Sequence, residues 1–156
     1  MAGLANVYRD ARDNGDPRAS LRRWIDDANA DFQARMDWTA SADFDAANHP
    51  PDVHVDTDLD LTLYAGQRIV IDASKSTDPD GDALDFDWSH YVEAGTYRGR
   101  VELVPSGPGK ATFTAPQVST RETVHILLAV RDDGGPPLSG YARLVVTVVP
   151  PAVFGE

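Results

Sequence analysis

The chain of 156 residues contains no cysteine. Disulfide bonds, thiolate nucleophiles and sulfur-ligated zinc sites are therefore excluded, although exported bacterial domains often lack cysteine as well. Basic residues are also few, because 14 Lys and Arg stand against 25 Asp and Glu and leave a formal charge of -11. A surface this negative repels nucleic acid and anionic lipid, so we expect neither as a partner. Divalent cations and neutral ligands such as sugars remain compatible with it.

Long apolar runs are missing too, and no segment has the length and hydropathy of a membrane span. The first ten residues, M-A-G-L-A-N-V-Y-R-D, lack the apolar core of a signal peptide. Strong fold signals begin only near Asp16, and we expect the chain to be the end of a longer protein whose export signal lies upstream. Nucleophile-elbow, zinc and phosphate-loop motifs are absent, so we expect no catalytic activity.

A helix is predicted near the N-terminus, with Asp16 as its cap and Pro17 as its first residue. Its apolar residues recur at spacings of three and four and form one stripe, which consists of Leu21, Trp24, Ile25, Ala28, Phe32 and Met36. A stripe this apolar needs a partner surface. That surface is either the rest of this chain or another domain.

The two prolines in N-H-P-P, residues 48–51, end any helix and mark a domain boundary. We divide the chain into a helical segment 1–47, the boundary 48–51, a β domain 52–150 and a tail 151–156. About seven strands are predicted in the β domain, at roughly ten-residue spacing. They cover residues 54–63, 67–72, 83–91, 101–104, 111–114, 124–130 and 144–148. The pattern predicts a mainly β fold, an immunoglobulin-like antiparallel sandwich preceded by an amphipathic helix.

The run D-A-S-K-S-T-D-P-D-G-D-A-L-D-F-D-W, residues 72–88, joins a strand end, a turn and a second strand. Leu84, Phe86 and Trp88 alternate on the inward face, so we assign Trp88 to the core. Three carboxylates in the turn, with a fourth from a neighbouring turn, form a candidate calcium site that consists of Asp78, Asp80, Asp82 and Asp132. The simpler interpretation, which we favour, is that these aspartates cap their own turn through backbone amides.

Tyr91 and Tyr97 bracket a loop that contains Glu93. Exposed aromatic rings stack on the apolar C–H face of a sugar, so these three residues are the candidate carbohydrate-binding residues. Packing of the loop against another domain is the alternative. The four histidines are isolated in the sequence, and we interpret them as surface residues.

The β domain resembles the PKD and cadherin-like modules of secreted bacterial enzymes. The residues that carry this resemblance are N-H-P-P, the D-P-D-G-D run and R-D-D-G-G-P-P-L from Arg131. A closer resemblance includes the helix, through A-R-M-D-W at residues 34–38, W-S-H-Y at 88–91 and E-A-G-T-Y at 93–97. It is to the C-terminal region of a bacterial cellulose-binding family whose larger N-terminal domain is nucleoside-hydrolase-like. That family's metal cluster and ribose pocket lie in the N-terminal domain, and no residue here inherits those roles.

This resemblance implies a secreted or periplasmic, non-catalytic accessory domain that contacts cellulose or a related polysaccharide. Its partner within the same protein would be the upstream nucleoside-hydrolase-like domain. Two alternatives stay open: a structural spacer with no ligand of its own, and a calcium-dependent adhesion module. A coplanar row of exposed aromatic rings would favour carbohydrate binding, and its absence would favour the spacer.

Overall fold

Seven strands and one long helix make up most of the computed structural model, which describes residues 18–41 and 43–151. The helix is α1 (Ala19–Ala40), and two short 3-10 helices follow it, η1 (Phe44–Ala46) and η2 (Val92–Ala94). The strands are β1 (Asp60–Tyr64), β2 (Arg68–Asp72), β3 (Asp85–His90), β4 (Val104–Gly107), β5 (Lys110–Thr114), β6 (Glu122–Arg131) and β7 (Ser139–Val149). Within these described residues no helix has both the length and the apolar character that a membrane span requires.

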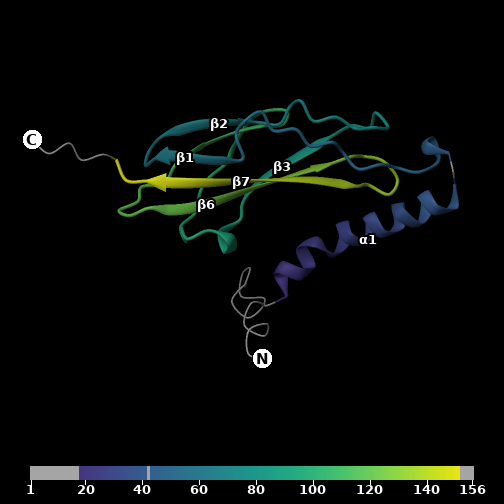
Figure 1. Ribbon diagram of the computed structural model, residues 1–156, viewed down its shortest axis with the longest axis horizontal. Helices are drawn as coiled ribbons and strands as arrows, with labels where there is room; N and C mark the ends of the chain where they lie inside the picture. The colour runs from purple at the N-terminus through teal and green to yellow at the C-terminus, as the bar shows by residue number, and fades with distance from the viewer. Residues whose placement is uncertain (1–17, 42, 152–156) are drawn as a thin grey trace, which may run out of the picture.

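The strands form two sheets that face each other, one in the order β1-β7-β6-β3 and the other in the order β2-β5-β4 (Figure 1). Neighbouring strands are antiparallel except β1 and β7, which pair in parallel from Asp60 opposite Val145 to Tyr64 opposite Val149. This arrangement confirms the predicted immunoglobulin-like sandwich.

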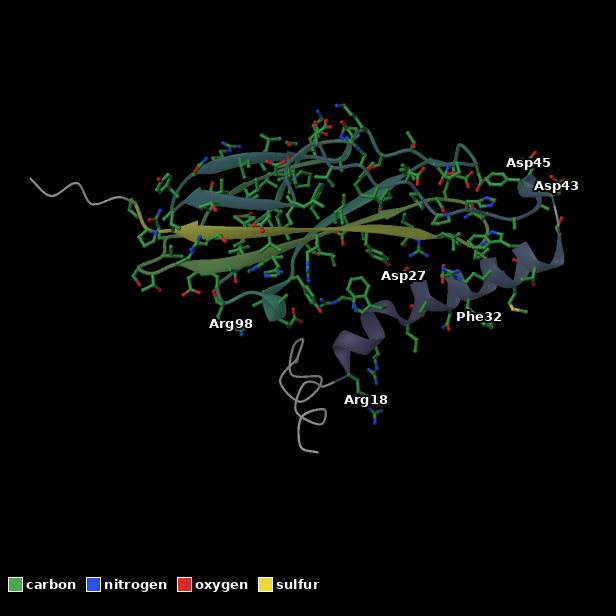
Figure 2. All side chains as sticks on the ribbon, viewed as in Figure 1. Arg18, Asp27, Phe32, Asp43, Asp45 and Arg98 are labelled. Atoms are coloured by element: carbon green, nitrogen blue, oxygen red, sulfur yellow. The ribbon has the colours of Figure 1, made fainter. Side chains whose placement is uncertain are left out.

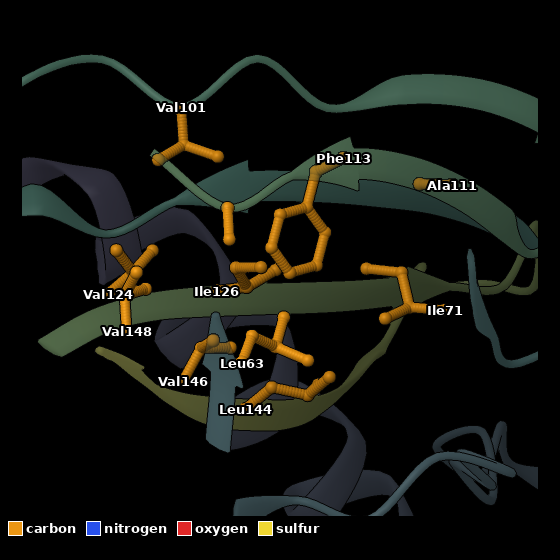
Figure 3. Close-up of a cluster of buried hydrophobic side chains, with 11 residues drawn as sticks. Leu63, Ile71, Val101, Ala111, Phe113, Val124, Ile126, Leu144, Val146 and Val148 are labelled. Carbon is orange, nitrogen blue, oxygen red and sulfur yellow. The ribbon is translucent and has the colours of Figure 1, made fainter. Parts of the chain in front are cut away.

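The core lies between the sheets, where alternate residues of the strands point inward. In β6 the buried side chains are Val124, Ile126, Leu128 and Val130, and in β7 they are Leu144, Val146 and Val148. Phe113 and Ile71 enter from the opposite sheet (Figure 3). The buried side chains form a large cluster and a smaller one of Ala73, Leu128 and Val130, and the half-buried Trp88 packs against both, as its inward register predicts. Its Nε1 donates to the carbonyl oxygen of Gly109 at 3.3 Å.

The prediction for the fourth strand is wrong in position. Val101 is buried but lies outside any strand, and β4 instead runs through Val104–Gly107, most of which lies between the predicted strands 101–104 and 111–114. Pro105 is tolerated there because β4 is an edge strand, where a missing backbone donor costs no ladder bond. The first strand is shorter than predicted, since only Asp60–Tyr64 pairs with β7.

Side-chain contacts hold α1 beside β7. The Trp24 ring meets Tyr141 edge-on, with centroids 5.3 Å apart at 85°. Tyr141 Oη donates to Asp27 Oδ2 at 2.5 Å, and Ser139 Oγ donates to Asp27 Oδ1 at 3.3 Å. Near the other end of the helix, Trp38 Nε1 donates to the carbonyl oxygen of Asn48 at 2.9 Å.

The apolar stripe predicted for the helix is divided between two faces. Trp24 packs on the sandwich, whereas Ile25, Phe32 and Met36 are 46%, 66% and 53% exposed. Figure 2 shows Asp27 directed toward the sheet and Phe32 directed away from it. The helix begins at Ala19 after Arg18, and the predicted cap Asp16 and first residue Pro17 lie outside the described residues.

Truncation of Ile126 to alanine removes a fully buried side chain from the core of β6. We expect the free energy of unfolding to fall by about 2–5 kcal/mol, because the lost burial adds to the cost of the cavity. Urea denaturation measures this change. The control is Val70→Ala in β2, a residue 54% exposed, and an equal loss in both variants would contradict the assignment of the core.

Replacement of Tyr141 by phenylalanine removes the hydrogen bond to Asp27, and we expect a loss of about 1 kcal/mol at neutral pH. Burial, and then the bond to Asp27, raise the pKa of Tyr141 to about 12 from its ordinary value of 10.0. The unfolded chain therefore loses this proton at lower pH than the folded chain does. Stability from Tyr141 is complete below pH 10 and decreases as the pH rises to about 12. Urea denaturation across this range should show the advantage of the wild type over Tyr141→Phe narrowing, and a constant difference would contradict the pKa assignment.

Candidate functional site

Two places in the structure contain the residues that the sequence marks as functional. The first is the turn between β2 and β3. Asp78 Oδ1 accepts backbone N–H groups from Asp80 at 2.9 Å and from Asp82 at 3.2 Å, and Gly81 has a φ of 82° that favours glycine. The turn-capping interpretation is therefore correct for Asp78. The same geometry brings carboxylate oxygens of Asp78, Asp80 and Asp82 within 4.8 Å of one another.

Asp132 lies in the turn between β6 and β7 and holds Asn48 against it. It is 3% exposed, and its Oδ1 accepts from Asn48 Nδ2 at 3.0 Å, from Gly134 N at 3.1 Å and from Leu138 N at 2.9 Å. The adjacent Asp133 Oδ1 accepts from the backbone of Ala83 at 2.8 Å. The structure thus brings together both turns that the sequence separates by some fifty residues.

Negative charge accumulates at this place. Burial raises the pKa of Asp82 above its ordinary value, and so do the charges of Asp78, Asp133, Asp132 and Asp80. An open hollow of about 480 Å³ borders the turn, and its lining includes Asn48, Asp80, Asp82, Gly134 and Gly135. We call it the acidic hollow.

His49 also belongs to this place, although its isolation in the sequence led us to interpret it as a surface residue. Its backbone N–H donates to Asp80 Oδ2 at 2.6 Å, and its Nδ1 lies 3.1 Å from Asp80 Oδ1. Its ring stacks on Phe44 with centroids 3.7 Å apart and lies nearly parallel to Trp38 at 5.4 Å. The N-H-P-P boundary is the sequence signal that could have drawn attention to His49 and Asn48.

The second place is the loop after β3, with the predicted sugar-binding residues. Tyr91, Glu93 and Tyr97 are half-buried, not exposed as expected. The guanidinium of Arg23 on α1 lies 5.4 Å above the Tyr91 ring, and its Nη2 is 3.4 Å from Glu93 Oε1. Tyr97 packs against the core cluster beside His90. Contacts with the helix and with the core therefore cover the side chains that were predicted to bind a ligand.

A more accessible surface lies beside this loop. A hollow of about 560 Å³, which we call the β3 hollow, is lined by Trp88, Ser89, His90, Val92, Arg98, Gly99, Arg100, Val101, Glu102 and Leu103. Arg98 (Figure 2), Arg100 and Glu102 are exposed. Arg98 Nη1 donates to the carbonyl oxygen of Val92 at 3.1 Å. No sequence pattern marks these residues, because only the fold places the segment after Tyr97 beside β3.

His90 is one of the residues that line the β3 hollow. Its Nδ1 accepts from the backbone of Val101 at 3.3 Å, so the proton of the neutral ring lies on Nε2. That Nε2 is buried and has no hydrogen-bond partner among the described residues. Burial lowers the pKa of His90, and burial likewise lowers the pKa of His125. His90 is therefore a neutral polar group in the lining of the hollow.

A row of exposed aromatic rings is not found in the part of the chain that the structure describes. The large exposed aromatic side chains lie on four different elements, Phe32 on α1, Phe44 on η1, Tyr64 on β1 and Tyr141 on β7. Tyr141 is also engaged by Trp24 and Asp27. The flat stacking surface that would suit a crystalline polysaccharide is therefore absent from these residues.

A family model and a solved structure both match this chain. Residues 68–148 match the family model described as cellulose-binding protein Sde0182, C-terminal domain. A solved structure from Saccharophagus degradans, a nucleoside hydrolase-related hypothetical protein associated with carbohydrate metabolism, is 41% identical to this chain, with a TM-score of 0.78. The match covers 82% of this chain and 32% of that protein, so the chain spans about a third of its relative's length. No curated protein matches the chain.

Weaker likenesses are to the PKD domain of the KIAA 1837 protein and to a protocadherin, PcdhgB3. The PKD domain is 23% identical with a TM-score of 0.47, over 67% of this chain and 91% of that one. The protocadherin is 13% identical with a TM-score of 0.39, over 66% of this chain and 25% of that one. The family model covers more than half of the chain, and the match to the Saccharophagus relative covers 82% of it. The chain therefore belongs to the family of the C-terminal domain of cellulose-binding protein Sde0182.

Proposed function

We propose that this chain is a non-catalytic accessory domain that binds polysaccharide, cellulose or a related glucan, through the β3 hollow. The observation that carries the proposal is the match of residues 68–148 to a family described as cellulose-binding. The association of the Saccharophagus relative with carbohydrate metabolism supports the same ligand class. The net charge of -11 also agrees with a neutral ligand.

The chemistry of the β3 hollow suits sugar hydroxyl groups. Arg100 supplies hydrogen-bond donors, Glu102 supplies acceptors, and Ser89 supplies both. Because these groups line an open hollow and not a row of flat rings, we propose that the ligand is a single polysaccharide chain, as in amorphous cellulose, and not a crystal face.

The proposed context is a longer, secreted or periplasmic protein with an upstream nucleoside-hydrolase-like domain. The support for it is the Saccharophagus protein, which is nucleoside hydrolase-related and about three times as long as the matched region. In that context α1 is the segment that leads from the upstream domain into the sandwich.

A structural spacer is the second candidate, and one observation favours it. Arg23 of α1 covers Tyr91 and pairs with Glu93, so the loop predicted to bind sugar instead fixes the helix to the sandwich. A spacer needs such a fixed angle between its two ends, whereas a sugar platform needs these rings exposed.

Retention on insoluble glucans tests the proposal, with amorphous and crystalline cellulose compared side by side. We expect the wild type to bind amorphous cellulose more strongly. We expect the variants Arg100→Ala and Glu102→Ala each to lose about tenfold in affinity, because a hydrogen bond to a charged group contributes about 1.5–3 kcal/mol.

The matched control is Arg121→Ala, which removes an exposed arginine that does not line the β3 hollow. Its binding should equal that of the wild type. If the wild type is retained on no glucan, the carbohydrate proposal fails and the spacer is favoured. If Arg121→Ala loses as much affinity as Arg100→Ala, the attraction is a general charge effect and the β3 hollow is not the site.

A further inference from the structure

A second hollow borders the β3 hollow and shares part of its lining. It has a volume of about 320 Å³, and we call it the β5 hollow because residues of β5 line it. Its other lining residues include Arg68, Tyr97, Val104, Pro116 and Gln117. Three consecutive residues, Arg100, Val101 and Glu102, line both hollows. The two hollows therefore meet at the segment that leads from the loop after β3 to β4.

This shared segment is anchored in the core of the sandwich. Val101 is 6% exposed and belongs to the large core cluster (Figure 3), and its backbone N–H donates to His90 Nδ1 at 3.3 Å. Burial alternates along the segment, so Arg100, Glu102 and Val104 are exposed on its outer side. Arg100 and Glu102 line both hollows, whereas Val104 lines only the β5 hollow. The outer side of the segment thus leads from one hollow to the other.

The polar side chains along this path are not engaged by the protein itself. Among the described residues, the side chains of Arg68 and Arg100 form no ion pair or hydrogen bond, although acidic residues outnumber basic ones by 25 to 14. The side chains of Glu102 and Gln117 likewise form none within the described part of the chain. Their donors and acceptors are therefore available to a ligand.

We propose that the β3 hollow and the β5 hollow are two subsites of one groove, and that a single glucan chain occupies both by crossing residues 100–102. This inference rests on the proposed function, because it extends the site in the β3 hollow. In the β5 hollow, Arg68 and Gln117 donate hydrogen bonds to sugar hydroxyl groups. The half-buried Tyr97 and Pro116 offer apolar surface to the C–H face of a sugar ring.

A groove with two subsites selects its ligand by length. A disaccharide makes contacts in one hollow, whereas a longer chain gains the contacts of the second hollow without a second loss of translational and rotational freedom. The affinity should therefore rise with the length of the oligosaccharide until both hollows are filled.

The experiment is calorimetric titration of the chain with cellobiose and with cellohexaose. We expect cellohexaose to bind at least tenfold more tightly, because each additional hydrogen bond raises the affinity by about fivefold.

Two variants test whether the β5 hollow is the source of this difference. Arg68→Ala and Gln117→Ala remove side chains that line the β5 hollow and not the β3 hollow. Each should weaken cellohexaose binding by about fivefold, so the ratio of the two affinities falls toward one. Arg100→Ala should weaken the binding of both ligands, because Arg100 lines both hollows.

The fold of these variants should be preserved, since Arg68 and Gln117 make no side-chain hydrogen bond among the described residues, and thermal unfolding checks this. Gln33→Ala is the matched control for Gln117→Ala, because Gln33 is an exposed glutamine on α1 that lines neither hollow. It should bind both oligosaccharides as the wild type does.

The possible outcomes separate this inference from the proposed function. Equal affinity for the two oligosaccharides overturns the inference but agrees with binding in the β3 hollow alone. The inference also fails if Arg68→Ala and Gln117→Ala keep the wild-type ratio of affinities, because the longer chain then extends over another surface. If neither oligosaccharide nor amorphous cellulose binds, the proposed function is wrong, and the inference fails with it.

Discussion

The pairing of β6 with β7 is the interaction on which the rest of the structure depends. The two strands pair antiparallel from Glu122 opposite Val148 to Arg131 opposite Ser139. One face of this ladder supplies seven of the nine largest fully buried side chains among the described residues, and its two edges hold β3 and β1. The end of the ladder carries Asp132, and Tyr141 holds α1. One long hairpin therefore positions the core, the helix and the turn that contains Asp78, Asp80 and Asp82.

Strict alternation of apolar residues predicted β6 and β7 because period two is the geometry of any strand with one buried face. The same rule failed for β4, since Val104, Pro105 and Gly107 carry no such pattern and only the pairing with β5 makes them a strand. The aspartates of the acidic turn were predictable because their capping is local. The contributions of Asn48 and His49 were not predictable, because they depend on tertiary contacts. Asn48 binds Asp132 in one turn, and His49 binds Asp80 in the other.

Exposure of Tyr91 and Tyr97 was inferred from their position at the two ends of a loop, and the structure corrects it for a physical reason. A loop is exposed only where nothing else packs on it, and α1 brings Arg23 across this one. The hollow beside it is built from Ser89 and His90 on a strand and from Arg100 and Glu102 on the following segment. Each of these residues is unremarkable in the sequence, and only their convergence makes a polar surface.

Because of the way in which α1 is attached, we expect it to unfold locally more often than the sandwich does. The described contacts between α1 and the sandwich are all made by side chains, at Arg23, Trp24, Asp27 and Trp38. The helix shares no backbone ladder with the strands, so its release leaves both sheets and their core intact. Such a segment opens at lower free energy than the global unfolding reaction. The amide hydrogens of α1 should accordingly exchange with solvent faster than those of β6. The helix would then unfold locally while the sandwich stays folded.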